Sequence, residues 1–253
     1  MSFYKSRNPP AEIARRLRQE SGFGCALCGS PFIEYHHIVE WKDEEHFDPE
    51  HMVAICPNCH SRFHRMTPQK QYLIKAKPFN LSTTQTDDRI EFRTNLDAMI
   101  LGGSFFLNCP RIVRYNDTCI LGWRVGGGEF LLTLRMSDPF GTPLLTIEDN
   151  AVVFRQGNFW DFEFKYNWIK LKSKIGGQFA EIDLRREPIT ISLVTFLGGK
   201  KLEIGKNSIK ISEYSQVTQS YFSAIPGYCL NIHQSEFQQS QGLIGGNAWT
   251  IPL

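Results

Sequence analysis

The stretch that decides the fold contains Cys25-Ala-Leu-Cys28, then Tyr35-His36-His37-Ile38, and ends in Cys56-Pro-Asn-Cys59-His60-Ser-Arg-Phe-His64. Two C-x2-C pairs at this separation are typical of one tetrahedral zinc ion held by four thiolates. Four thiolates leave no open coordination position, so the zinc is predicted to be structural rather than catalytic. Short strands bury too little apolar surface to be stable alone, and a bound zinc ion would supply the missing stability.

Histidines are interleaved with these cysteines at spacings that suit a second metal ion. His36 and His37 are adjacent, so on an extended strand their side chains point to opposite sides. His60 and His64 are four residues apart, so on a helix they share one face. One ion can therefore take a ligand from the strand and one or two from the helix. The other histidine of the adjacent pair stays free to act as a base.

Residues 21–64 resemble the HNH endonuclease superfamily, the ββα-metal nucleases, in the form with two zinc-binding cysteine pairs. The resemblance is carried by Ser21-Gly-Phe-Gly-Cys-Ala-Leu-Cys-Gly29, Tyr35-His-His-Ile38 and His51-Met-Val-Ala-Ile-Cys-Pro-Asn-Cys-His60. It implies that His37 is the general base that activates water. It also implies one catalytic divalent ion, Mg²⁺, Mn²⁺ or Ni²⁺, in addition to the structural Zn²⁺. The implied ligands of that catalytic ion are His36, His60 and His64, and contact with phosphate is the alternative role for His64.

One residue departs from the family pattern. His51 stands where the family usually has the asparagine that pins a loop and helps to orient the base. A histidine can donate a similar hydrogen bond, although its ring is larger. The resemblance therefore makes His51 a candidate catalytic residue. His46 lies in the acidic loop before it and is expected to have a structural or loop-bracing role.

The charge distribution is compatible with a nucleic-acid partner. A net charge of +2 is small, but basic residues gather before the first cysteine pair and after the second. Arg62 and Arg65 lie beside the helix histidines and are candidate DNA contacts. Ordinary solvent-exposed arginines are the alternative interpretation of the same two residues.

Length and composition are those of a soluble globular protein. The chain has 253 residues, of which 42% are hydrophobic and 21% are charged, enough for one large or two modest domains. No apolar run approaches the 18 residues that a membrane span needs. The start of the chain lacks the apolar core of a secretion signal, and cysteines in metal-binding pairs suit a reducing compartment. These features predict a cytoplasmic location.

The composition changes along the chain and predicts an α+β protein in three parts. Residues 1–77 are expected to be an HNH nuclease domain, with helices over Pro9–Glu20 and His60–Lys75 and strands over Phe32–Val39 and His51–Ile55. Residues 78–88 are predicted to be a polar linker. Residues 89–253 contain short alternating runs, beginning with Ile90–Arg93, and predict an all-β domain built as a sandwich, a barrel or a short β-helix.

The resemblance implies an endodeoxyribonuclease that hydrolyses phosphodiester bonds in double-stranded DNA. A restriction or phage-defence role would suit the added β-rich part, which would supply specificity, dimerisation or regulation. A homodimer stays open, and no membrane partner is expected. Two alternatives remain: a zinc-scaffold DNA-binding module that has lost cleavage, and an interaction protein dominated by its β-rich part. The complete histidine set favours the enzyme, because a pure zinc scaffold does not need it.

Overall fold

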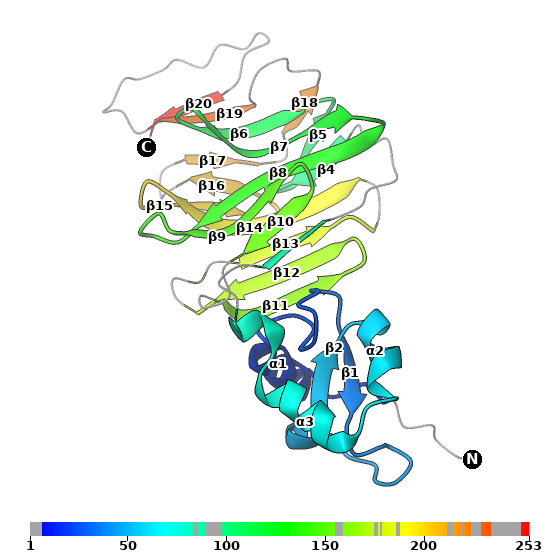
Figure 1. Cartoon of the computed structure of the whole chain (residues 1–253). Coiled ribbons are helices and arrows are strands. Elements are labelled where there is room, and N and C mark those ends of the chain that lie inside the picture. Colours follow the sequence, from blue (N-terminus) through cyan, green and yellow to red (C-terminus); the bar gives the residue numbers. More distant parts are fainter. Residues whose placement is uncertain are drawn as a thin grey trace, which may run out of the picture.

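The computed structural model is a mixed α+β structure that consists mostly of β-sheet, with its helices in the N-terminal part (Figure 1). It describes residues 7–82, 86–89, 98–154, 159–174, 177, 179–185, 188–211, 215–218, 220–223, 229–233 and 249–252. Within these residues, no helix is both long and apolar enough to cross a membrane. The predicted strand over Ile90–Arg93 lies outside the described residues.

The N-terminal part starts with helix α1 (Ala11–Glu20), two residues after the predicted start at Pro9. Its turns bury Leu17, which is 1% exposed, and Ala14. Strand β1 (Glu34–His37) then pairs in antiparallel fashion with β2 (Met52–Ile55), and His36 lies opposite Val53. Both strands are shorter than predicted. Between them, a 3-10 turn η1 (Pro49–His51) takes up His51, the residue that was expected to begin the second strand.

The single helix expected from His60 to Lys75 is wrong, because the structure has two helices there. Helix α2 (Pro57–Phe63) ends with His64 as its C-cap, and helix α3 (Pro68–Ala76) begins after Thr67. Pro68 occupies the first turn of α3, where its missing N–H costs nothing, and it disfavours helical backbone at the residue before it. The break lets α3 fold back toward α2 and β1.

The residues predicted to be a linker include packed elements. A 3-10 turn η2 (Phe79–Ser82) contains Asn80, which is 1% exposed. The Asn80 amide donates hydrogen bonds to the carbonyls of Gly22 and Gly29, at 3.1 and 3.2 Å. Strand β3 (Thr86–Arg89) then pairs with β10 of the β-rich part. The start of the connecting segment is therefore hydrogen-bonded to the N-terminal part through Asn80, and its end pairs with a sheet of the β-rich part through β3.

The described strands of the β-rich part form two sheets over one buried core, as in a sandwich (Figure 1). One sheet has the order β20-β19-β6-β7-β8-β9-β10-β3, and the other runs β11-β12-β13-β14-β15-β16-β17 with β4, β5 and β18 attached beside it. Alternation between buried and less buried residues is regular in β14, as period-2 strands require. The amide of Ser137 donates to the Thr195 hydroxyl at 2.8 Å and so joins the two sheets.

The bounds of the strands are as follows: β4 (Ala98–Leu101), β5 (Ser104–Leu107), β6 (Arg111–Tyr115), β7 (Thr118–Gly126), β8 (Glu129–Ser137), β9 (Pro143–Glu148), β10 (Ala151–Phe154), β11 (Phe159–Lys165), β12 (Trp168–Ser173), β13 (Phe179–Asp183), β14 (Ile189–Leu197), β15 (Lys200–Ile204), β16 (Ile209–Ile211), β17 (Ser215–Val217), β18 (Tyr221–Ser223), β19 (Leu230–His233) and β20 (Trp249–Pro252). Of these, β11 contacts helix α1 of the N-terminal part.

Candidate metal centres and the cleft between them and the sheet

Four cysteine sulfurs form a compact cluster. The Sγ atoms of Cys25, Cys28, Cys56 and Cys59 all lie within 4.8 Å of one another. The first pair sits in a turn closed by a hydrogen bond from the Cys25 amide to the Ser30 carbonyl at 2.7 Å. In the second pair, Cys56 is the N-cap of helix α2 and Cys59 lies in its first turn. The first pair precedes β1 and the second follows β2, and the antiparallel pairing of Glu34 with Ile55 brings these two segments to the same end of the hairpin.

The electrostatics of this cluster suit a divalent cation. Burial raises the pKa of the Cys28 thiol to about 11 and also raises the pKa of Cys59. Thiolates packed together repel one another, and only a cation among them makes full deprotonation favourable. Four clustered sulfur donors match the ligand preference of a structural Zn²⁺ ion. The donor set therefore fits a structural zinc ion and offers no open position for chemistry.

A second cluster consists of three histidines. Ligand atoms of His36, His60 and His64 all lie within 4.8 Å of one another. The His60 and His64 rings stack at a centroid distance of 4.9 Å, and the His36 ring stands edge-on to both, at 5.0 and 5.1 Å. His36 comes from β1, while the other two lie one helical turn apart at α2 and its C-cap. The structure thus brings together the strand histidine and the two helix histidines.

Hydrogen bonds assign the protonated nitrogen of two of these rings. The buried Gln71 amide donates from Nε2 to the carbonyls of Phe63 and Met66, at 2.9 and 3.2 Å. Its Oε1 is therefore the acceptor that faces His36 Nε2 at 3.1 Å. His36 then carries its proton on Nε2 and keeps the lone pair of Nδ1. In the same way, Glu34 Oε2 lies 2.8 Å from His60 Nδ1 and leaves Nε2 of that ring as the lone-pair donor.

His36 is kept neutral by its surroundings. Burial, reinforced by the neighbouring histidines His60 and His64, lowers its pKa to about 4, although the Gln71 hydrogen bond acts in the opposite direction. A neutral imidazole is the form that binds a metal ion. Imidazole nitrogens suit Zn²⁺, Ni²⁺ and Co²⁺ better than Mg²⁺. The three-histidine set therefore fits a divalent transition metal and leaves coordination positions open.

His37, the other member of the adjacent pair, is held by a different partner. Its Nε2 lies 3.2 Å from the backbone carbonyl of His46, which can only accept, so Nε2 carries the proton and Nδ1 has the lone pair. The His46 ring in turn bonds the Val39 carbonyl at 3.0 Å and braces the loop. Burial lowers the pKa of His37, and the charges of His46 and Arg7 lower it further. The ring is accordingly neutral at pH 7.

The remaining candidate residues do not line the cavity that contains the histidine cluster. His51 Nδ1 lies 2.7 Å from the Tyr72 hydroxyl, and its side chain is 44% exposed. It does not line the cavity described next, so its part in catalysis stays a prediction. Arg62 and Arg65 are exposed near the end of α2 and also lie outside that cavity. Their contact with DNA likewise stays a prediction.

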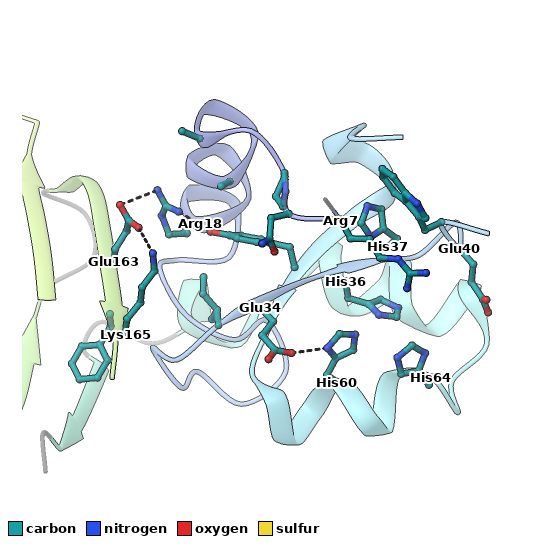
Figure 2. A pocket seen from close by; sticks show the side chains of 18 of the residues that line it. Arg7, Arg18, Glu34, His36, His37, Glu40, His60, His64, Glu163 and Lys165 are labelled. Atoms are coloured by element: carbon teal, nitrogen blue, oxygen red, sulfur yellow. Dashed lines mark hydrogen bonds and ion pairs between the residues drawn. The ribbon is translucent and has the colours of Figure 1, made fainter. Parts of the chain in front are cut away.

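The histidine cluster and His37 open into one cavity of about 890 Å³ (Figure 2). Arg7 and Lys42 from the N-terminal part line it, as do Glu163, Phe164 and Lys165 from strand β11. In Figure 2, Glu163 and Lys165 lie at one end of this cavity, and His37 and Glu40 lie at the other. Sequence patterns gave no signal for the part that β11 plays here, because no local motif marks it. Gln71 was missed for the same reason.

The comparisons with known proteins agree with this geometry. Residues 25–65 match the family model of the HNH endonucleases, a match that contains both C-x2-C pairs and all three clustered histidines. It indicates nuclease-type activity and leaves the β-rich part unassigned. No curated protein and no solved structure matches the chain.

Proposed function

From the HNH match of residues 25–65, we propose that this chain is a metal-dependent endonuclease that hydrolyses phosphodiester bonds in double-stranded DNA. One observation carries the proposal. Three histidines with convergent ligand atoms lie in the same cavity as a fourth, neutral histidine whose Nδ1 lone pair is not used by its backbone partner. Together they provide metal ligands and a base, the two requirements of hydrolysis at phosphorus.

In this proposal, His36, His60 and His64 hold one divalent ion through neutral imidazole nitrogens. A bound ion supplies Lewis-acid chemistry, which offsets negative charge on the phosphate and on the leaving oxygen. Gln71 and Glu34 hold two of the three rings in the tautomers that present a lone pair to the ion. Mn²⁺ and Ni²⁺ are expected to support activity at least as well as Mg²⁺.

His37 is the proposed general base. Its Nδ1 takes a proton from water while the water oxygen forms a bond to phosphorus and the bond from phosphorus to the 3′ oxygen breaks. The hydrogen bond from its Nε2 to the His46 carbonyl fixes the ring and stabilises the positive charge that the proton brings. A pKa below the ordinary value keeps the base unprotonated at neutral pH.

Arg7 is the basic residue that we assign to the substrate phosphate. It lines the cavity, and its charge is felt by His37, which places it near the base. Within the described part of the chain, no acidic side chain forms an ion pair with it, so its charge is available to an anion. Arg62 and Arg65 would extend the contact along the outside of α2.

The four cysteines would hold a structural zinc ion that fixes β1, β2 and α2 as a ββα-metal unit. We divide the chain into this nuclease part, residues 1–77, a connecting segment, residues 78–88, and the β-rich part, residues 89–253. A restriction or phage-defence role in the cytoplasm would suit a nuclease of this organisation.

The test is a plasmid assay with the full chain. Purified protein is incubated with supercoiled DNA and Mn²⁺, Ni²⁺ or Mg²⁺, beside a chelator control and the His36→Ala and His60→Ala variants. We expect metal-dependent conversion to nicked or linear DNA that both variants lose. Binding of DNA without cleavage under any metal would contradict the nuclease and favour the zinc-scaffold binding module. Neither binding nor cleavage would favour an interaction protein.

A further inference from the structure

We propose that strand β11 of the β-rich part forms one wall of the DNA-binding cleft, with Lys165 as a phosphate contact beside the cleavage site. This inference rests on the proposed nuclease function and adds a substrate-binding surface to it. It assigns a role to a region that the HNH match leaves out, since that match ends at residue 65.

The first observation is that the cleft is shared. Glu163, Phe164 and Lys165 of β11 line the same cavity as His36, His37 and the helix histidines. Figure 2 shows Glu163 and Lys165 of β11 at one end of this space, and His60 and His64 farther along it. A nucleic-acid strand whose phosphate reaches the histidines and that follows the cavity therefore passes the β11 wall.

The second observation is that the wall is rigidly attached. Arg18 of α1 makes a two-pronged hydrogen bond to Asp161, with both N–O distances at 2.8 Å, and its side chain is only 8% exposed. The Gln19 amide donates to the Trp160 carbonyl at 2.6 Å, and the rings of Phe32 and Phe164 meet edge to face at 4.5 Å. A partly buried paired arginine and packed aromatic rings keep β11 in place beside β1.

The third observation concerns the charge at the wall. The Lys165 side chain is 67% exposed, and its Nζ lies 3.3 Å from Glu163 Oε2 and 5.1 Å from the centre of the Trp168 ring. Glu163 also lies 3.7 Å from the Arg18 guanidinium. When Lys165 turns toward a phosphate, Glu163 therefore keeps a cationic partner and is not left uncompensated. The free-energy cost of breaking the exposed ion pair between Lys165 and Glu163 is therefore small.

The chain offers a matched control for Lys165. Lys201 on β15 also pairs with the acidic residue two positions away, Glu203, at 2.7 Å, and its side chain is 48% exposed. It does not line the shared cavity. A lysine in the same kind of surface pair, but on another strand, thus separates contact with DNA from a general change of charge.

The experiment measures binding of the full chain, with its structural zinc retained and no Mg²⁺, Mn²⁺ or Ni²⁺ added, to a fluorescent DNA duplex over a range of salt concentrations. We expect Lys165→Ala to reduce the slope of log K against log salt by about 0.9, the value for one lost phosphate contact, and thus to weaken binding about tenfold near 0.1 M salt. Lys201→Ala should leave both quantities unchanged. Glu163→Gln should tighten binding, because it removes a negative charge and the competitor of the phosphate for Lys165.

The inference is overturned if Lys165→Ala binds like the wild-type protein, or if Lys201→Ala loses as much affinity. Cleavage separates this failure from failure of the proposed function. A wild-type protein that cuts DNA, with Lys165→Ala showing the same KM and kcat, would refute the β11 wall alone. A wild-type protein that neither binds nor cuts DNA would refute both.

Discussion

Gln71 accepts a hydrogen bond from His36, with 3.1 Å between Oε1 and Nε2, although the two residues belong to separate elements. The Gln71 amide nitrogen is occupied by the carbonyls of Phe63 and Met66, so the side chain cannot flip without losing both bonds. A residue of α3 thereby ties the end of α2 to the strand histidine. It selects the His36 tautomer that keeps a lone pair on Nδ1.

We predict that Gln71→Leu weakens binding of the catalytic metal by about 10- to 100-fold, the range found when a partner of a metal-binding histidine is removed. Calorimetric titration of Ni²⁺ into protein that retains its structural zinc measures this loss. Gln69→Leu, on the exposed face of the same helix, is the matched control and should bind Ni²⁺ as the wild type does. Equal affinity in the two variants would show that Gln71 does not position His36.

We predict that Cys28→Ser abolishes the structural zinc site. The cluster depends on four thiolates, and a serine hydroxyl is a poor ligand for Zn²⁺. Zinc released by a thiol-modifying reagent should be about one ion per chain in the wild type and close to none in the variant. Cys119→Ser, in the β-rich part, should release zinc like the wild type. Full zinc content in Cys28→Ser would contradict the site.

We predict a strong energetic coupling between Arg18 and Asp161. Loss of either partner leaves the other charge partly buried and uncompensated, so each single substitution is destabilising. A double-mutant cycle with Arg18→Met and Asp161→Leu, followed by urea unfolding, should give a coupling free energy of roughly 1 to 3 kcal/mol. Additive single effects would mean that this pair does not hold β11 against α1.

We predict that acid destabilises the protein in part through His36 when no ion is bound to the histidine cluster. Its folded-state pKa of about 4 lies below the ordinary value for histidine. Between these two pH values the unfolded chain binds more protons, so the free energy of unfolding falls as pH drops from about 6.5 toward 4. One such group contributes a slope of up to about 1.4 kcal/mol per pH unit.

Urea unfolding of the wild type and of His36→Gln at several pH values, without added catalytic metal, tests this dependence. Between pH 6.5 and 4, the free energy of unfolding of His36→Gln should depend less steeply on pH than that of the wild type. Identical slopes for the two proteins would exclude His36 as a source of acid sensitivity.

Much of the local structure was predictable because it follows from spacing and periodicity. The cysteine spacing predicted one cluster, and the four-residue separation of His60 and His64 predicted that their rings share a helix face. The break between α2 and α3 was missed, even though Pro68 and the preceding Thr67 are a typical helix start. That break matters, because it brings Gln71 to His36.

The remaining features depend on long-range contacts that no local pattern encodes. Arg18 and Asp161 are 143 residues apart in sequence, and either could have been an ordinary surface charge. Likewise, nothing around Lys165 distinguishes it in sequence from Lys201, since each pairs with a nearby glutamate. The packing of β11 against the N-terminal part places Lys165 in the cleft, whereas Lys201 does not line it.

The central claim is that His37 acts as a base beside an ion held by three other histidines. Its most direct test compares wild type with His37→Ala for plasmid cleavage in Mn²⁺ or Ni²⁺, with metal binding measured on the same samples. We predict that the variant binds the metal normally and cleaves at least about 100-fold more slowly, since a general base typically contributes 10²- to 10⁴-fold. Cleavage by His37→Ala at the wild-type rate would contradict the account.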